Sequence, residues 1–175
     1  MIRTRPAGWA FVLACAATAA LAQTPQQAEA TFRNQQGQEV GRAMLTQTAG
    51  GVLIEMELSN IPEGEHGFHI HETGACDAAD GFKSAGGHFE PAQHQHGYMA
   101  AGGPHAGDMP NQFAGSDGRL TANVLNSNVT LSDGPTSVLD ADGSAIIVHA
   151  KPDDYASQPT GDAGDRIACA VIEKR

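Results

Sequence analysis

One segment decides the fold class of this chain: Gly51-Val52-Leu53-Ile54-Glu55-Met56-Glu57-Leu58. Every second residue, from Val52 to Leu58, is apolar, and two of the residues between them are glutamates. Successive side chains of a β-strand point to opposite faces, so this alternation predicts a strand with one face in a core and the other in water.

Other segments extend the same pattern along the chain, and turn sequences separate several of them. We expect further strands at residues 29–34, 38–47, 66–71, 119–126, 145–150 and 166–172. No run of about 10–12 residues has the periodicity of a helix, and no internal repeat is visible. Many short strands and 21 glycines predict an all-β, antiparallel sandwich or barrel in a single domain.

Two long segments interrupt the strands, at about 72–111 and at 151–165. A loop of roughly 40 residues is too long to be structureless in a compact domain unless something fixes it. The first segment contains Cys76, four histidines and Asp108. We therefore expect a metal site and a disulfide to hold it.

The first 22 residues have the composition of a secretory signal peptide. Two arginines precede an apolar stretch that ends in the small-residue cleavage sequence Ala20-Leu21-Ala22. Cleavage there leaves residues 23–175 as the mature domain, and it removes Trp9, the only tryptophan. A lipoprotein site at Cys15 is the alternative, although few apolar residues precede it. Export of this kind predicts a periplasmic protein.

Cleavage takes the formal net charge from −10 to about −12, because two arginines are lost. Such an acidic chain repels nucleic acid and anionic membranes, so we expect neither as a partner. The mature domain keeps two cysteines, Cys76 and Cys169. In an exported protein two cysteines predict one disulfide, and closing a loop of about 90 residues stabilises a fold by roughly 4–5 kcal/mol.

The eight histidines are the strongest chemical signal. Seven lie between Gly64 and Pro110, and the eighth, His149, ends an apolar run. Imidazole with carboxylate suits zinc or copper, and more than four nitrogen ligands indicate more than one metal. On the strand 66–71, His69 and His71 share one face, whereas His66 shares the parity of the core residues. We therefore interpret His66 as structural; the alternative for His69 and His71 is a surface edge strand.

Six motifs, in order from about residue 29 to the end, resemble the copper/zinc superoxide dismutase family, and two of them have the form of its bacterial periplasmic members. They are Gly67-Phe68-His69-Ile70-His71-Glu72, Gly86-Gly87-His88-Phe89, His96-Gly97, Gly103-Pro104-His105-Ala106-Gly107-Asp108, Ile147-Val148-His149 and Arg166-Ile167-Ala168-Cys169. The resemblance implies a Greek-key barrel of about eight strands with two long functional loops. Glu90 and Ala170 depart from the family pattern, and His94 matches nothing in it; we interpret His94 as a surface histidine.

The resemblance also implies a ligand set for one copper and one zinc ion per subunit. Copper is expected at His69, His71, His88 and His149, and zinc at His88, His96, His105 and Asp108. Asp153 matches an aspartate that accepts hydrogen bonds from a copper and a zinc histidine, although a plain loop acid beside Asp154 is the alternative. Arg166 matches the family's active-site arginine, His88 is expected to bridge the metals and take part in catalysis, and Cys76 with Cys169 match its disulfide.

The implied activity is dismutation of superoxide to oxygen and hydrogen peroxide, by a redox-cycling copper beside a structural zinc, which protects the cell envelope. Because the chain is acidic, its site must be locally positive, and we hypothesise that Lys83 and Lys151 join Arg166 in steering the anion. Bacterial members of the family differ in oligomeric state, so a homodimer is allowed but not required. Two rival functions are a periplasmic metal buffer on the same fold and a zinc hydrolase, which needs an open zinc position.

Overall fold

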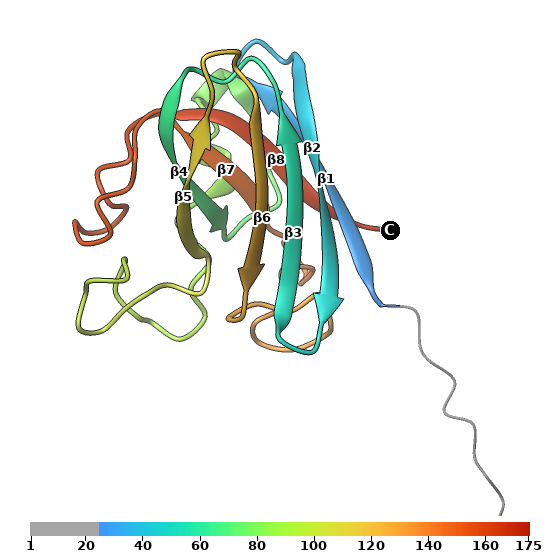
Figure 1. Cartoon of the computed structure of the whole chain (residues 1–175). Coiled ribbons are helices and arrows are strands. Elements are labelled where there is room, and N and C mark those ends of the chain that lie inside the picture. Colours follow the sequence, from blue (N-terminus) through green and yellow to red (C-terminus); the bar gives the residue numbers. More distant parts are fainter. Residues whose placement is uncertain (1–24) are drawn as a thin grey trace, which may run out of the picture.

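The described part of the chain, residues 25–175 of a computed structural model, consists of eight strands and two short 3-10 helices (Figure 1). The strands are β1 (Gln27–Asn34), β2 (Glu39–Thr48), β3 (Gly51–Leu58), β4 (Gly64–His71), β5 (Asp108–Ala114), β6 (Leu120–Asn126), β7 (Ala145–His149) and β8 (Arg166–Lys174); the helices are η1 (Ala78–Asp80) and η2 (Lys83–Ala85). None of the described helices is long and apolar enough to cross a membrane. The predicted signal peptide, with Trp9 and Cys15, lies outside the described residues.

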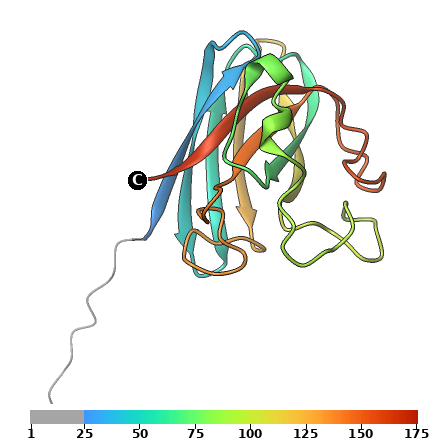
Figure 2. The same ribbon diagram turned by 180° about the vertical axis from the view of Figure 1, so that it is seen from behind.

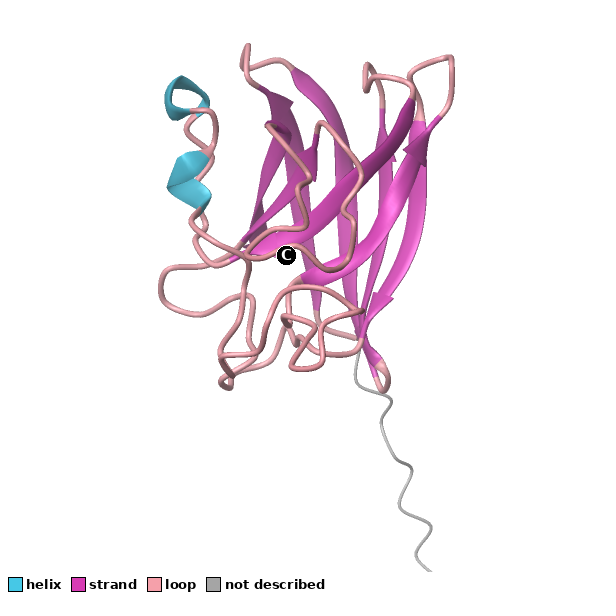
Figure 3. Cartoon of the chain, turned by 90° about the vertical axis from the view of Figure 1, so that its left-hand side faces the viewer, coloured by secondary structure: helices cyan, strands magenta, loops and turns pink. Residues whose placement is uncertain are grey.

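The strands close into a barrel in the order β1-β2-β3-β6-β5-β4-β7-β8, and β8 pairs with β1. Every pairing between these strands is antiparallel. The neighbours β3 and β6, and β4 and β7, are far apart in the chain, as in Greek-key connections. The prediction of an all-β antiparallel barrel is confirmed, and Figure 3 shows the strands wrapped around a common interior.

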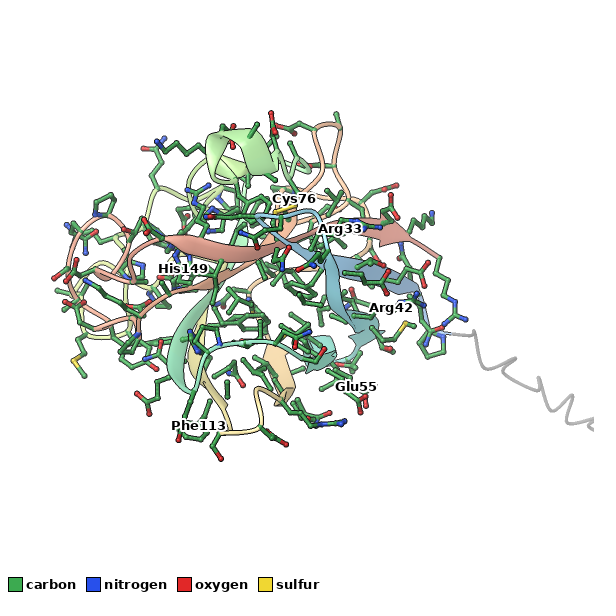
Figure 4. The ribbon with its side chains drawn as sticks, turned by 90° about the horizontal axis from the view of Figure 1, so that it is seen from above. Arg33, Arg42, Glu55, Cys76, Phe113 and His149 are labelled. Atoms are coloured by element: carbon green, nitrogen blue, oxygen red, sulfur yellow. A yellow bond between two sulfur atoms is a disulfide. The ribbon has the colours of Figure 1, made fainter. Side chains whose placement is uncertain are left out.

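The barrel interior is built from the alternation that the sequence shows on β3. Val52, Ile54 and Met56 are at most 1% exposed, whereas Glu55 lies on the outer face and points away from the barrel in Figure 4. Burying an aliphatic side chain of this size stabilises a fold by about 1.5–3 kcal/mol. The inward face of β3 is therefore part of what fixes its register in the sheet.

Strand β7 is buried on both faces, because the long loop after β4 covers its outer side (Figure 2). Ile146 and Val148 pack in the barrel interior. Ala145 and Ile147 form a second apolar cluster with Phe82, Ala85 and Cys169. This double burial explains why β7 is continuously apolar instead of alternating.

A disulfide between Cys76 and Cys169 fastens this loop to β8, as predicted. The two Cα atoms are 5.7 Å apart, and 93 residues separate the cysteines in the sequence. Figure 4 shows Cys76 beside the barrel, below the short helices. The loop that contains most of the expected metal ligands is therefore covalently tied to the sheet.

The prediction of loop structure as far as residue 111 was wrong, because β5 already begins at Asp108. Pro110 and the polar residues around it hide the strand pattern, since proline is depleted in strands. β5 pairs with β4 over most of its length but meets β6 at one position, Ala114 opposite Leu120. An irregular strand with one open edge leaves little periodicity in the sequence.

Candidate metal centre

The structure brings all the expected metal ligands together in two groups that share one residue. The first group is His69, His71, His88 and His149; the second is His88, His96, His105 and Asp108. Within each group, one nitrogen or oxygen atom per residue lies within 4.8 Å of the others. The shared residue is the histidine that the family resemblance assigns as the bridge.

Three of the first group's histidines come from adjacent strands. His69 and His71 lie on one face of β4, and His149 ends β7, the neighbour of β4 in the barrel. Gly67 makes room for them: a Cβ atom there would lie 2.9 Å from the side chain of Ala163 and 3.3–3.4 Å from His69 and His149. The fourth, His88, is brought in by an isolated bridge between its backbone and that of His71.

Each ring of the first group has one nitrogen tied to the protein and one without a partner. His69 Nε2 lies 2.7 Å from Asp153 Oδ2, and His71 Nδ1 lies 3.0 Å from the carbonyl oxygen of Gly86. His149 Nδ1 lies 3.2 Å from the carbonyl oxygen of Gly164. These contacts fix ring orientation in the way that carboxylate and carbonyl partners orient metal-binding histidines.

The opposite nitrogens are buried and have no hydrogen-bond partner among residues 25–175: His69 Nδ1, His71 Nε2, His88 Nε2 and His149 Nε2. Leaving a buried polar atom unsatisfied costs about 1–3 kcal/mol, so four such atoms in one group are explained if a cation completes them. Four imidazole nitrogens are a donor set that copper accepts. The first group therefore fits a copper ion.

The second group has the separations of a closed tetrahedral site. Asp108 Oδ1 lies 2.8 Å from His88 Nδ1, 3.0 Å from His96 Nδ1 and 3.6 Å from His105 Nδ1. His105 Nδ1 and His88 Nδ1 are 3.5 Å apart. Ligand atoms of a tetrahedral zinc, with bonds of about 2.0–2.1 Å, lie about 3.3 Å from one another. Three imidazoles and one carboxylate at these separations fit zinc.

Asp153 connects the two groups. Its Oδ2 faces His69 Nε2, and its Oδ1 lies 3.0 Å from His96 Nε2. Asn111 exchanges two hydrogen bonds with the backbone of Asp153. Gly161 packs directly against the Asp153 carboxylate, where a Cβ atom would not fit. Neither Asn111 nor Gly161 stood out in the sequence, because Asn111 lies on β5, far from Asp153 in the chain, and Gly161 meets Asp153 only where their shared loop folds back on itself.

Arg166 stands at the start of β8, opposite His149 in the β7–β8 register. Its Nη1 donates to the carbonyl oxygen of Phe82 at 2.6 Å, and its Nη2 donates to that of Gly86 at 2.7 Å. Burial lowers the pKa of Arg166 from its usual value, although an arginine stays protonated at neutral pH. The guanidinium thus places a fixed positive charge beside the first group.

Burial lowers the pKa values of three histidines in the first group, His69, His71 and His149. It lowers the pKa of His69 to about 4 and that of His149 to about 3, and it brings the pKa of His71 well below its usual value. Neighbouring histidines add to each of these shifts. Neutral imidazole is the form that binds a metal, so these three rings are ready to bind one across the physiological pH range.

The second group holds more charge. Burial acts to raise the pKa values of Asp108 and Asp153, but hydrogen bonds to histidines outweigh it and hold both pKa values well below their usual range. Burial acts to lower the pKa of His96, but its hydrogen bonds to these two carboxylates raise that pKa to about 9. In the metal-free protein, a protonated His96 therefore lies between two anions.

The remaining two described histidines lie outside both groups. His66 is 2% exposed, and its ring nitrogens lie 2.7 Å from the carbonyl oxygens of His149 and Pro62, in agreement with a structural histidine. His94 has a half-exposed side chain, with its Nδ1 3.4 Å from a carboxylate oxygen of Glu90. Lys83 and Lys151 are exposed.

Known proteins are similar to this chain in sequence and in fold. A sequence profile described as "Copper/zinc superoxide dismutase (SODC)" matches residues 39–172. "Superoxide dismutase [Cu-Zn] 1" of Aquifex aeolicus (strain VF5) is 50% identical over 142 residues, which cover 80% of this chain and 83% of that protein. "Superoxide dismutase [Cu-Zn]" of Caulobacter vibrioides (strain ATCC 19089 / CIP 103742 / CB 15) is 42% identical over 149 residues, covering 83% of this chain and 85% of that protein.

Among solved structures, a SOD-like protein from Bacillus subtilis superposes with a TM-score of 0.78 and is 36% identical, covering 82% of this chain and 96% of that one. The clock protein EA4 superposes with a TM-score of 0.70 at 29% identity, covering 89% of this chain and 99% of that one. The profile match and the two dismutase relatives cover most of the chain. The chain therefore belongs to the copper/zinc superoxide dismutase family.

Proposed function

We propose that this chain converts superoxide to oxygen and hydrogen peroxide at a copper ion held by the first group, with a zinc ion held by the second. Copper is assigned to His69, His71, His88 and His149, and zinc to His88, His96, His105 and Asp108. The observation that carries the assignment is the set of four buried, unpartnered nitrogens directed into the first group. The names of relatives from Aquifex aeolicus and Caulobacter vibrioides support the reaction.

When bound, copper supplies the one-electron redox chemistry, whereas zinc has a filled d shell and fixes its ligands. The protein's own part begins with orientation: Asp153 holds one ring of each group, and Gly86 holds His71. His88 has one nitrogen in each group. We expect its Nε2 to carry a proton only while that nitrogen is not bound to copper, after one superoxide has been oxidised to oxygen and before the next is reduced to hydrogen peroxide, while its Nδ1 stays directed at the second group.

Electrostatics explain how an acidic protein attracts an anion. Arg166 is held beside the first group by two carbonyl oxygens, so its charge is fixed where the substrate arrives. Lys83 and Lys151 are exposed and lie in the two long loops, after β4 and after β7, which suits a role in steering. Superoxide dismutases are standard examples of diffusion-limited enzymes that steer their substrate electrostatically, so steering is expected of the family. The assignment of Lys83 and Lys151 to this role is our own.

The two rival functions make different demands on the site. A zinc hydrolase needs an open coordination position on its zinc, whereas the second group already offers four donors. A metal buffer needs no positive charge held beside its copper. The carbonyl-anchored Arg166 therefore favours an enzyme.

The matched variants His149→Ala and His94→Ala test the assignment. His149→Ala removes one of the four unpartnered nitrogens, and we expect the reconstituted protein to lose copper and dismutase activity while it keeps one zinc. His94→Ala removes a half-exposed histidine outside both groups, and we expect it to match the unsubstituted protein. Full activity of His149→Ala would contradict the copper assignment.

We further propose that residues 1–22 are removed on export and that residues 23–175 act in the periplasm to protect the cell envelope. The arginine-led apolar leader supports this, and so does the disulfide, because disulfides persist in oxidising compartments. A purified periplasmic sample is expected to lack tryptophan emission, since Trp9 is the only tryptophan. A tryptophan emission band would contradict cleavage.

A homodimer is also compatible with the described surface. Four large apolar side chains are exposed on it: Tyr98, Met99, Phe113 and Leu125. Phe113, on β5, points outward in Figure 4 and is 62% exposed. Sedimentation of the metal-loaded protein would distinguish a monomer from a dimer.

A further inference from the structure

The peptide unit that joins Gly86 to Gly87 has polar partners at both ends. Its carbonyl oxygen, that of Gly86, accepts from His71 Nδ1 at 3.0 Å and from Arg166 Nη2 at 2.7 Å. Its N–H, that of Gly87, donates to Glu72 Oε1 at 2.8 Å. A peptide unit is planar, so whatever fixes the N–H also fixes the direction of the carbonyl.

We propose that Glu72 is a positioning residue for the dismutation reaction: its carboxylate holds the Gly86–Gly87 peptide so that one carbonyl oxygen orients both His71 and Arg166. The inference rests on the proposed function, because it assigns His71 to copper and Arg166 to the substrate. Within the described residues, the side-chain hydrogen bond of Glu72 goes to the N–H of Gly87 and not to a metal-binding histidine. It acts through the peptide.

The local sequence makes such a brace necessary. A peptide between two glycines rotates with little steric resistance, because neither neighbour has a Cβ atom. Gly86 has φ +75°, a left-handed conformation that glycine adopts readily. The Glu72 carboxylate also occupies the place of a side chain there, since a Cβ on Gly86 would lie 2.6 Å from Oε1.

Backbone hydrogen bonds align the flanking segments without holding this peptide. The Glu72 N–H donates to the carbonyl oxygen of Gly87 at 3.0 Å, and the Thr73 N–H donates to that of Ala85 at 3.1 Å. Both bonds engage carbonyl groups on either side of the Gly86–Gly87 unit. The carboxylate of Glu72 is what engages the N–H of the unit itself.

The negative charge of Glu72 strengthens the arrangement. Hydrogen bonds to an ionised acceptor are about twice as strong as neutral ones, and hydrogen bonds in a chain polarise one another. The carboxylate therefore makes the Gly86 carbonyl a better acceptor for the Arg166 guanidinium. By polarising one peptide unit, an exposed carboxylate can thus assist a site that attracts anions.

This role predicts an effect opposite to that of charge alone. Glu72 is a negative group near the path of an anionic substrate, so simple Coulomb repulsion predicts tighter anion binding when it is removed. Positioning predicts weaker anion binding, because Arg166 and His71 lose a fixed acceptor. The sign of the change separates the two.

The test compares Glu72→Ala, Glu72→Gln and Glu72→Asp in the metal-loaded protein, with azide as a probe anion followed by its absorption with copper. Glu72→Ala removes the acceptor, Glu72→Gln keeps an oxygen without the charge, and Glu72→Asp keeps the charge but falls short by one methylene. Compared with the unsubstituted protein, we expect azide to bind about fivefold more weakly to the Ala and Asp variants, the factor expected for one hydrogen bond. We expect it to bind about as tightly to the Gln variant, because that variant keeps the hydrogen bond and its loss of charge assistance is offset by the loss of Coulomb repulsion of the anion. Glu65→Ala, which removes an exposed glutamate on β4, is the matched control.

A second readout does not depend on activity. In the reduced, metal-loaded protein, the Gly87 amide is expected to exchange with solvent about tenfold faster in the Ala and Asp variants than in the Gln variant. Azide binding to Glu72→Ala as tight as to Glu72→Gln, or a Gly87 amide equally protected in Ala, Asp and Gln variants, would overturn the proposal. Failure of the unsubstituted, copper-loaded protein to dismute superoxide would instead overturn the proposed function, and the amide exchange would still report on Glu72.

Discussion

Replacing Asp153 tests how the two metal groups are coupled. Its carboxylate accepts from His69 in the first group at 2.7 Å and from His96 in the second at 3.0 Å. Each of these rings needs its proton on Nε2 so that Nδ1 is free for a metal. Asp153→Ala leaves both Nε2 atoms buried without their acceptor, so both metals are affected.

The expected magnitude follows from that loss. Removing the partner of a metal-binding histidine lowers metal affinity about 10–100-fold, or about 1.4–2.8 kcal/mol. Asp153→Ala is therefore expected to weaken copper and zinc binding by that factor each. Asp153→Asn offers one oxygen and one NH2 group, so one ring keeps its acceptor and the other must accept instead, which moves its proton to the metal-facing nitrogen. Compared with the unsubstituted protein, Asp153→Asn is then expected to lose affinity for the two metals unequally, with one loss at least about tenfold larger than the other.

Competition with a chelator, titrated separately for each metal, measures both affinities. Asp154→Asn is the control, because that neighbouring carboxylate is exposed and bonds only to the local turn at Ala156 and Ser157. Unchanged affinity for both metals in Asp153→Asn, or an equal loss of both, would refute the reasoning.

Three further predictions concern protons, stability and steering. The pKa of His96 is raised to about 9, so zinc must displace a proton below that pH. We expect about one proton to be released per zinc at pH 7–8, and the apparent zinc affinity to rise with pH. Calorimetry in buffers of different ionisation enthalpy measures this release, and finding none would contradict the prediction. The same shift stabilises the metal-free fold fully below about pH 6.5, and this contribution is lost as pH rises through about 9. The buried Ser144 hydroxyl has no hydrogen-bond partner in the described part of the chain, so Ser144→Ala is expected to raise the free energy of unfolding by about 1 kcal/mol. The Ser137 hydroxyl accepts from a backbone N–H, so Ser137→Ala is expected to lower it in the same denaturant titration. Lys83→Glu combined with Lys151→Glu is expected to slow dismutation and to weaken its decline with salt; an unchanged rate and salt dependence would remove both residues from steering.

Strands such as β3 could be predicted from sequence, because their alternation of apolar and polar residues shows which face lies in the core. The strand β5 could not, since Pro110 and an open edge opposite β6 erase the alternation. Parity alone placed His69 and His71 on a common face. Their partners were assigned through the family motifs, because the contacts join residues far apart, as between His69 and Asp153, 84 positions away.

The supporting residues show the same limit. Glu72 contributes one side-chain hydrogen bond, Asn111 contributes two, and Gly161 contributes the absence of a side chain. No local periodicity marks such positions. Glu72 and Gly86 do lie within family motifs, at the end of the first and the start of the second, but the hydrogen bonds that connect them are visible only in the folded chain.

The most direct test of a copper-dependent enzyme with two metals is a copper titration of the zinc-loaded protein, with dismutation of superoxide measured at each step. The two groups in the described residues predict one copper and one zinc per chain. We expect no activity with zinc alone, a linear rise with added copper, and saturation at one copper per chain. Activity with zinc alone, or saturation at another copper ratio, would contradict the account.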